Sequence, residues 1–181
     1  MAIRIYGNRK IETLAGEATR PTASKVREAL FNIWQGRVLG ARCLDLCSGS
    51  GAIGAEALCR GASEVVGIEK SGAACKVVLR NWQKVAKPEQ TYRAIRGDVV
   101  RQLKGLTSFD LIYFDPPYAS GLYQPVLNRL ANCLTIKGEV AVEYGDGHWD
   151  PHQLAESALN RLEIVREKHY GSTSLVFFQR Q

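Results

Sequence analysis

An acidic residue, two prolines and a tyrosine directly follow the mostly apolar segment 109–114, as Asp115-Pro116-Pro117-Tyr118. An apolar segment of this length is typical of a buried strand, and ligands bind where parallel strands end. Asp115 offers a carboxylate, and Pro116 offers a carbonyl without a competing N–H group. A base amine is a weak nucleophile because its lone pair is delocalised into the ring. Two acceptors on a stiff turn could hold its N–H groups and free that lone pair.

Tyr118 adds an aromatic ring to this turn. Stacking of a base on such a ring is worth roughly 1–3 kcal/mol. A base held there must be flipped out of a duplex or already unpaired. We therefore predict that Asp115, Pro116, Pro117 and Tyr118 are catalytic in transfer of a group to a base amine. The alternative is a rigid surface turn capped by two prolines.

A glycine-rich segment precedes this turn in the chain. Gly49, Gly51 and Gly54 fit the G-x-G-x-x-G pattern between a predicted strand at 43–46 and a predicted helix at 52–59. Glu69 ends the next predicted strand, 20 residues beyond Gly49, where a carboxylate usually binds ribose hydroxyls. Asp98 follows the third strand, where it can meet an adenine edge. Together these residues predict a nucleoside site. A tight strand–helix turn without a ligand is the alternative.

Asp45 helps to choose between nucleoside cofactors. This carboxylate lies four residues before Gly49, and it would repel a dinucleotide pyrophosphate at a cost of about 1–4 kcal/mol at 4 Å. S-adenosylmethionine has no phosphate and carries a sulfonium and an ammonium group. We therefore predict S-adenosylmethionine as the cofactor. The residues predicted to bind it are Asp45, Cys47, Ser48, Gly49, Ser50, Gly51, Glu69, Lys70, Asp98, Val99 and Asp115.

The positive charge of the chain is unevenly distributed. Of a net charge of +6, residues 1–42 supply +5, from eight Lys or Arg against three Glu, and the other 139 residues supply +1, from sixteen against fifteen. Such an excess either solvates a surface or attracts a polyanion. The residues predicted to contact such a polyanion are Arg4, Arg9, Lys10, Arg20, Lys25 and Arg27.

Predicted strands and helices alternate through the middle of the chain. A hairpin over 4–14 and a helix from Thr22 or Ser24 to about Trp34 come first. Strands are then predicted at 43–46, 64–69, 92–96, 109–114 and 139–143, helices at 52–59, 72–85 and 124–133, and a final hairpin at 163–169 and 174–179. This alternation predicts an α/β fold with a mostly parallel sheet covered by helices on both faces.

Several classes of protein and site are disfavoured by composition. No apolar run approaches the roughly 20 residues that span a bilayer. The first ten residues contain no apolar core of a signal peptide. The five cysteines form no Cys-x-x-Cys pair, which argues against zinc, and their odd number argues against a disulfide framework. We expect a soluble, cytoplasmic monomer that needs neither a metal nor a membrane.

Taken together, the motifs resemble those of the bacterial and plastid enzymes that methylate the exocyclic N2 of a guanine in small-subunit (16S) ribosomal RNA. The resemblance covers nearly the whole chain. It is carried by Arg20-Pro-Thr, residues 26–32 (VREALFN), Asp45-Leu46, Gly49-Ser50-Gly51, Glu56-Ala57-Leu58, Arg60-Gly61-Ala62, Glu69, Asn81, Gly97-Asp98, Asp115-Pro116-Pro117-Tyr118 and Tyr170-Gly171. One departure is Cys47-Ser48, which stands where that family commonly has Phe-Ala.

The resemblance implies a Rossmann-like class I methyltransferase whose seven-stranded sheet ends in an antiparallel strand. It implies one domain over 1–181, with a basic hairpin and helix at 1–40 and a catalytic core at 41–181. The implied partner is ribosomal RNA, within the small subunit or an assembly intermediate. Three alternatives remain open: methylation of adenine N6 in DNA or RNA, a nicotinamide dehydrogenase, and a non-catalytic RNA-binding protein.

Overall fold

A computed structural model describes residues 2–14, 21–154 and 161–181 of the chain. Its elements follow one another in the order β1 (Ala2–Ile5), η1 (Tyr6–Asn8), β2 (Arg9–Glu12), α1 (Pro21–Ile33), β3 (Arg42–Leu46), α2 (Ala52–Cys59), β4 (Glu64–Glu69), α3 (Gly72–Val85), β5 (Thr91–Arg96), α4 (Val99–Gln102), β6 (Phe109–Phe114), α5 (Tyr123–Cys133), β7 (Leu134–Gly145), η2 (Pro151–Gln153), β8 (Leu162–Tyr170) and β9 (Thr173–Arg180).

A seven-stranded sheet in the order β5-β4-β3-β6-β7-β9-β8 forms the centre of the fold. The strands β3 to β7 pair in parallel, and β9 pairs antiparallel with both β7 and β8. Along the chain, β3 is the first strand of this sheet, and the strand order reverses between β3 and β6. The connections that follow these two strands therefore lie on opposite faces of the sheet. Open α/β sheets bind ligands at such a switch point, outside the carboxyl ends of the strands.

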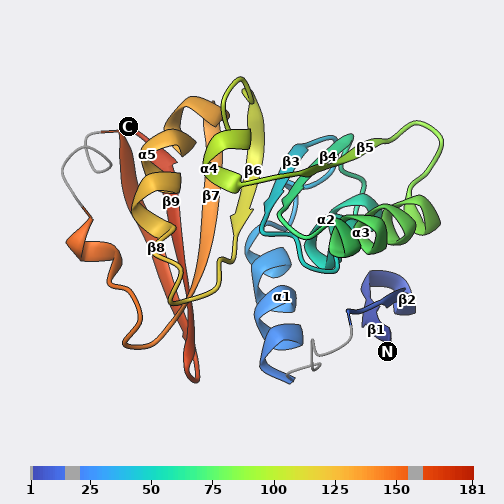
Figure 1. The fold of residues 1–181 in the computed structure, drawn as a ribbon, viewed down its shortest axis with the longest axis horizontal. Helices are drawn as coiled ribbons and strands as arrows, with labels where there is room; N and C mark the ends of the chain where they lie inside the picture. The colour runs from blue at the N-terminus through green and yellow to red at the C-terminus, as the bar shows by residue number, and fades with distance from the viewer. Residues whose placement is uncertain (1, 15–20, 155–160) are drawn as a thin grey trace.

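Helices cover both faces of this sheet, and each face has its own apolar core. One core joins α1, α2 and α3 to one face, with Phe31, Trp34 and Trp82 among its buried side chains. The other joins α4 and α5 to the opposite face, through residues such as Phe114 and Leu130. The central strands are apolar on both faces because both are covered. In Figure 1, β3 and β6 point toward the lower end of the molecule.

The two-stranded hairpin of β1 and β2 lies outside the sheet, next to α2 and α3 (Figure 1). Its inward residues Ile5 and Ile11 are buried in the core under these helices. Asn81 of α3 exchanges two hydrogen bonds with the backbone of Glu12, at 2.9 Å each. The hairpin is therefore attached by both apolar contacts and specific polar contacts.

The predicted fold class, sheet and N-terminal hairpin are confirmed, with differences at element ends. The helix α1 begins at Pro21, so neither Thr22 nor Ser24 is its cap, in keeping with the preference of proline for the first turn. The strand β7 runs over twelve residues, well beyond the predicted 139–143. The short helix α4 was not predicted, because its four residues show no period. No helix within the described ranges is long and apolar enough to cross a membrane.

Candidate active site

A cleft of about 870 Å³ opens at the carboxyl ends of β3, β4, β5, β6 and β7. It is lined by residues of the glycine-rich segment, by Glu69 and Asp98, and by the whole Asp115–Tyr118 turn. The two motifs that the sequence separates by more than 60 residues therefore share one cavity. Because β3 and β6 are adjacent in the sheet, their following loops meet at this edge.

The glycine-rich loop is shaped by Trp82 of α3. Gly51 has a φ of +74°, which suits glycine, and its carbonyl accepts a hydrogen bond from the Trp82 indole at 2.8 Å. A Cβ atom on Gly54 would lie 2.3 Å from the indole ring. The loop can pack against Trp82 only because these positions lack side chains. The same Cβ atom would lie 2.8 Å from Val65 of β4, so the third glycine of the motif allows α2 to pack closely on both α3 and the sheet.

Asp45 lies under this loop at the end of β3. Its carboxylate is almost fully buried and accepts a hydrogen bond from the Gly54 N–H group at 3.1 Å. Burial raises the pKa of Asp45 to about 7, although the Gly54 N–H group opposes the shift, and the nearby Glu69 carboxylate raises it further. Such a group gains most from a cationic ligand, which would favour its charged form.

Glu69 and Asp98 lie where the sequence predicted them, at the ends of β4 and β5. One oxygen of Glu69 accepts a hydrogen bond from the Gly49 N–H group at 3.0 Å, and the other accepts one from Ser71 at 2.8 Å. Asp98 caps α4 by accepting a hydrogen bond from Arg101 at 3.0 Å. Both carboxylates therefore also hold local structure. Each oxygen has two lone pairs, so these bonds leave capacity for a ligand.

The remaining predicted cofactor residues also line the cleft, with the exception of Gly51, which packs behind it against Trp82. Cys47 adopts a φ of +60°, and its backbone N–H group donates to Ile68 at 2.9 Å. Burial raises the pKa of Cys47 to about 12, with smaller contributions from Glu69 and Asp115. Its thiol therefore stays protonated. Lys70 is exposed at the rim, and Val99 is the buried first residue of α4.

The Asp115–Tyr118 turn lies at the end of β6, with Pro116 buried and Pro117 exposed. The Tyr118 ring packs against Gly145, the last residue of β7, and against His148 in the loop that follows. A Cβ atom on Gly145 would lie 2.5 Å from this ring, and the His148 ring centroid lies 5.5 Å from that of Tyr118. The structure therefore places a second aromatic side chain beside the predicted stacking surface.

Two further residues of the cleft, Tyr113 and Glu143, were missed by sequence reasoning. Both are buried, and the Tyr113 hydroxyl donates a hydrogen bond to the Glu143 carboxylate. Burial, with the Glu143 charge, holds the pKa of Tyr113 well above its usual range. Glu143 lies inside a buried run of β7, and a charged residue in such a run was the available signal.

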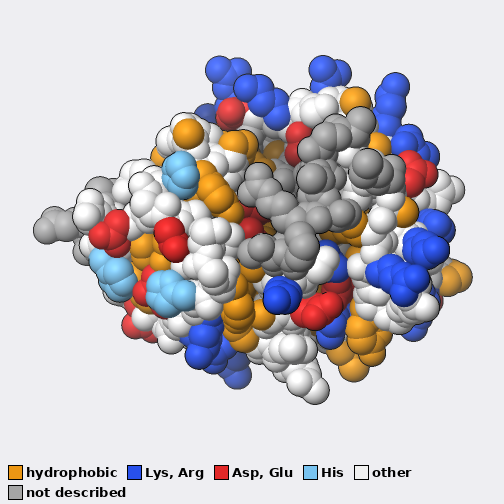
Figure 2. All heavy atoms as spheres, turned by 90° about the horizontal axis from the view of Figure 1, so that it is seen from below, with side chains coloured by type: hydrophobic (Ala, Val, Ile, Leu, Met, Phe, Trp, Pro, Cys, Tyr) orange, Lys and Arg blue, Asp and Glu red, His pale blue; other side chains and the backbone are white. Residues whose placement is uncertain are grey.

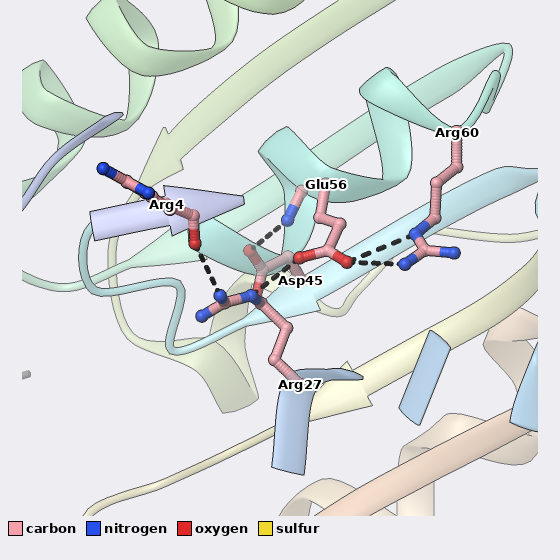
Figure 3. Close-up of polar contacts among 6 residues, drawn as sticks. Arg4, Arg27, Asp45, Glu56 and Arg60 are labelled. Carbon is pink, nitrogen blue, oxygen red and sulfur yellow. Dashed lines mark hydrogen bonds and ion pairs between the residues drawn. The ribbon is translucent and has the colours of Figure 1, made fainter. Parts of the chain in front are cut away.

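Arg27 does not have the free side chain that a predicted RNA contact requires. It is 7% exposed, and its guanidinium pairs with Glu56 at 2.7 Å and donates to the Arg4 carbonyl at 2.8 Å. Glu56 also pairs with Arg60 at 2.8 Å. Figure 3 shows these residues joining α1, α2 and the hairpin close to Asp45. The geometry therefore gives Arg27 a structural role.

The other predicted RNA contacts are placed differently from one another. Arg4, Lys10 and Lys25 have exposed side chains. Arg9 is also exposed, yet its guanidinium donates to the Val85 carbonyl and to the Cys59 sulfur, both at 3.3 Å. Arg9 therefore helps to attach the hairpin. Arg20 lies outside the described residues.

The chain matches the family model described as "Conserved hypothetical protein 95" over residues 3–179. It is 30% identical to "Ribosomal RNA small subunit methyltransferase D" of Haemophilus influenzae, over 97% of this chain and 90% of that protein. The identity to the Escherichia coli protein of the same name is also 30%, over 99% of this chain and 90% of that protein. The chain belongs to the Conserved hypothetical protein 95 family.

A solved structure from Escherichia coli, named "Putative methyltransferase yhhF", supports the same assignment. Its sequence is 28% identical to this chain, and the two structures superpose with a TM-score of 0.82 over 100% of this chain and 99% of that one. The "Crystal structure of putative methylase HI0767" from Haemophilus influenzae gives a TM-score of 0.78 at 26% identity. The family member described here therefore has the class I methyltransferase fold. Within its described residues, no group of His, Cys, Asp or Glu side chains could hold a metal ion.

Proposed function

We propose that this protein methylates the exocyclic N2 of a guanine in small-subunit ribosomal RNA, with S-adenosylmethionine as cofactor. The observation that carries the proposal is the single cleft that holds both the glycine-rich loop and the Asp115–Tyr118 turn. Relatives named for ribosomal RNA methylation, similar over nearly their whole length, supply the substrate class. These relatives are bacterial, and bacterial small ribosomal subunits are assembled in the cytoplasm, where we expect the protein to act.

The cleft suits S-adenosylmethionine in size and charge. Its volume of about 870 Å³ lies within the range of small-molecule sites. Among the described residues, its lining includes two cations, Lys70 and Arg27, the second already paired with Glu56, and five carboxylates: Asp45, Glu69, Asp98, Asp115 and Glu143. Glu69 would bind ribose hydroxyls, Asp98 the adenine edge, and the buried Asp45 would favour the cationic end. When bound, S-adenosylmethionine supplies a methyl group on an electrophilic sulfonium.

The residues of the turn would hold the target base. The Asp115 carboxylate and the Pro116 carbonyl accept hydrogen bonds from the amine, which leaves its lone pair free to react. Because the two prolines stiffen the turn, these acceptors are in place before the base arrives. Tyr118, with His148 beside it, offers a surface on which a flipped base can stack.

The charge of the cleft favours guanine over adenine. The amine edge of guanine presents two neighbouring donors, N1–H and N2–H, whereas the ring nitrogen beside the adenine amine is an acceptor. Besides Asp115, the carboxylates of the cleft include Glu143, which accepts a hydrogen bond from Tyr113. Carboxylates accept hydrogen bonds and, when ionised, cannot donate them. A donor-rich edge therefore fits the site better than a mixed one.

The proposal is tested by incubating the purified protein with methyl-labelled S-adenosylmethionine and one of three substrates: small ribosomal subunits lacking the modification, naked small-subunit RNA, or duplex DNA. Digestion to nucleosides then identifies the methylated base. We expect N2-methylguanosine from an RNA-containing substrate. N6-methyladenosine would overturn the guanine assignment, and label in the DNA alone would overturn the RNA assignment.

A further inference from the structure

Positive charge is concentrated in a second part of the chain, besides the N-terminal segment. Residues 70–104 contain nine Lys or Arg and two acids, Glu89 and Asp98, which gives +7 within 35 residues. Residues 43–69 and 105–181 each carry −3, from one base against four acids and from six bases against nine. When residues 43–181 are counted together, the two negative segments nearly cancel the positive charge of residues 70–104.

All nine cationic side chains of this segment are exposed. They are Lys70, Lys76, Arg80, Lys84, Lys87, Arg93, Arg96, Arg101 and Lys104, and together we call them the basic belt. Within residues 2–14, 21–154 and 161–181, Arg80 is the only one of them that forms an ion pair, with Glu12 of the hairpin. The charge of the belt is therefore largely uncompensated by the protein itself.

The fold arranges the belt around one edge of the sheet. The strand β5 is the edge strand, with α3 packed on one face and α4 on the other. Lys76 lies in the second turn of α3, Arg96 at the end of β5 and Arg101 in α4. The belt thus passes from one face of the sheet, across the β5 edge, to the other.

The belt also borders the cleft and the hairpin. Lys70 lines the cleft, and Arg96 and Arg101 flank the cleft residues Gly97, Asp98 and Val99. On its other side, Lys84 donates a hydrogen bond to the Lys10 carbonyl at 2.9 Å, which continues the belt into the hairpin. In Figure 2, which views the cleft end of the molecule, Lys and Arg gather on the right-hand side and along the upper edge.

We propose that the basic belt is the main docking surface for the RNA backbone, with the target nucleotide reaching the cleft across the Lys70, Arg96 and Arg101 end. This inference rests on the proposed function and names the surface by which that substrate is held. Exposed, unpaired cations bind phosphates and release counterions, so they supply affinity without reading sequence. Residues 105–181, which supply the sheet from β6 to β8, carry a net charge of −3 and would repel the same backbone.

The test compares two charge-matched triple variants in binding to a transcript of full-length small-subunit RNA. The first changes Lys76, Arg96 and Arg101 of the belt to Ala. The control changes Lys137, Lys168 and Arg180, exposed cations of β7, β8 and β9, to Ala. Affinity is measured over a range of salt concentrations. Each phosphate contact that is lost should lower the slope of log K against log salt by about 0.7 to 0.9.

We expect the belt variant to lose about two units of slope and at least about tenfold in RNA affinity at moderate salt, and the control to match wild type. Cofactor affinity should be unchanged in both. Equal slopes for the belt variant and wild type would overturn the proposal. The cations would then serve only to keep the edge strand β5 from pairing with another chain. Binding of wild type to anionic vesicles but not to RNA would also overturn it. Absence of methyl transfer to any RNA by wild type would instead refute the proposed function.

Discussion

Asp45 is a buried group whose raised pKa lies close to neutral pH, so its ionisation bears directly on stability. Burial raises its pKa from an ordinary value of 3.8 to about 7. Between these values the unfolded chain has lost the proton and the folded chain keeps it, so stability falls as pH rises through this window. At about 1.4 kcal/mol per pKa unit, the fall amounts to at most about 4 kcal/mol.

Asp45→Asn should remove this pH dependence, because an amide does not titrate and its oxygen can still accept the Gly54 hydrogen bond. Denaturant titrations of wild type and variant between pH 4 and 8 measure the difference. We expect wild type to lose free energy of unfolding relative to the variant as pH rises. Parallel curves would show that Asp45 has an ordinary pKa.

Gly145 determines the position of the Tyr118 ring. A Cβ atom there would lie 2.5 Å from two ring carbons, so Gly145→Ala must displace the ring. We expect transfer to RNA to lose about 1–3 kcal/mol of transition-state stabilisation, the value of one stacked base. Cofactor affinity should stay unchanged. As a control, the same change in a Tyr118→Ala background should cost almost nothing more. A full additional loss there would mean that Gly145 acts through another contact.

At the scale of elements, one side chain links the hairpin, α3 and the glycine-rich loop. Asn81 is 1% exposed, and its amide nitrogen donates to the Ser50 carbonyl at 2.8 Å as well as to Glu12 at 2.9 Å. These contacts explain why an asparagine occurs within a helix that otherwise buries apolar residues. The hairpin is thereby coupled to the cofactor end of the cleft.

Asn81→Ala should lower the free energy of unfolding by about 1–3 kcal/mol, because it leaves buried backbone groups without a partner. The hairpin should also exchange its amide hydrogens faster, since it loses both hydrogen bonds to Glu12. Hydrogen exchange followed by mass spectrometry measures both effects. The exposed Gln83→Ala, two residues further along α3, is the matched control. Equal protection of the hairpin in all three proteins would show that its apolar contacts suffice.

For the whole molecule, the sequence predicts the strands of the sheet well, but it does not predict which charged side chains lie together in the folded protein. Strands β3, β4 and β6 are mostly apolar, as is typical of buried parallel strands, and the glycine-rich and acidic residues at their ends indicate the ligand edge. Contacts between distant segments are not visible in this way. Tyr113 and Glu143 meet only because β6 and β7 are neighbours in the sheet. The basic belt likewise becomes one surface only when α3, β5 and α4 are folded around an edge.

The most direct test of the central claim separates cofactor binding from transfer in Asp115→Ala. If the turn holds the target amine, S-adenosylmethionine affinity by calorimetry should stay within a few fold of wild type. Single-turnover transfer to small-subunit RNA should fall at least about a hundredfold, as on loss of other groups that stabilise charge in the transition state. Asp115→Asn, which keeps one acceptor oxygen, should retain part of the rate. Glu163→Ala, an exposed acid of β8, should behave as wild type. Loss of cofactor binding with an unchanged transfer rate at saturating cofactor would contradict the account.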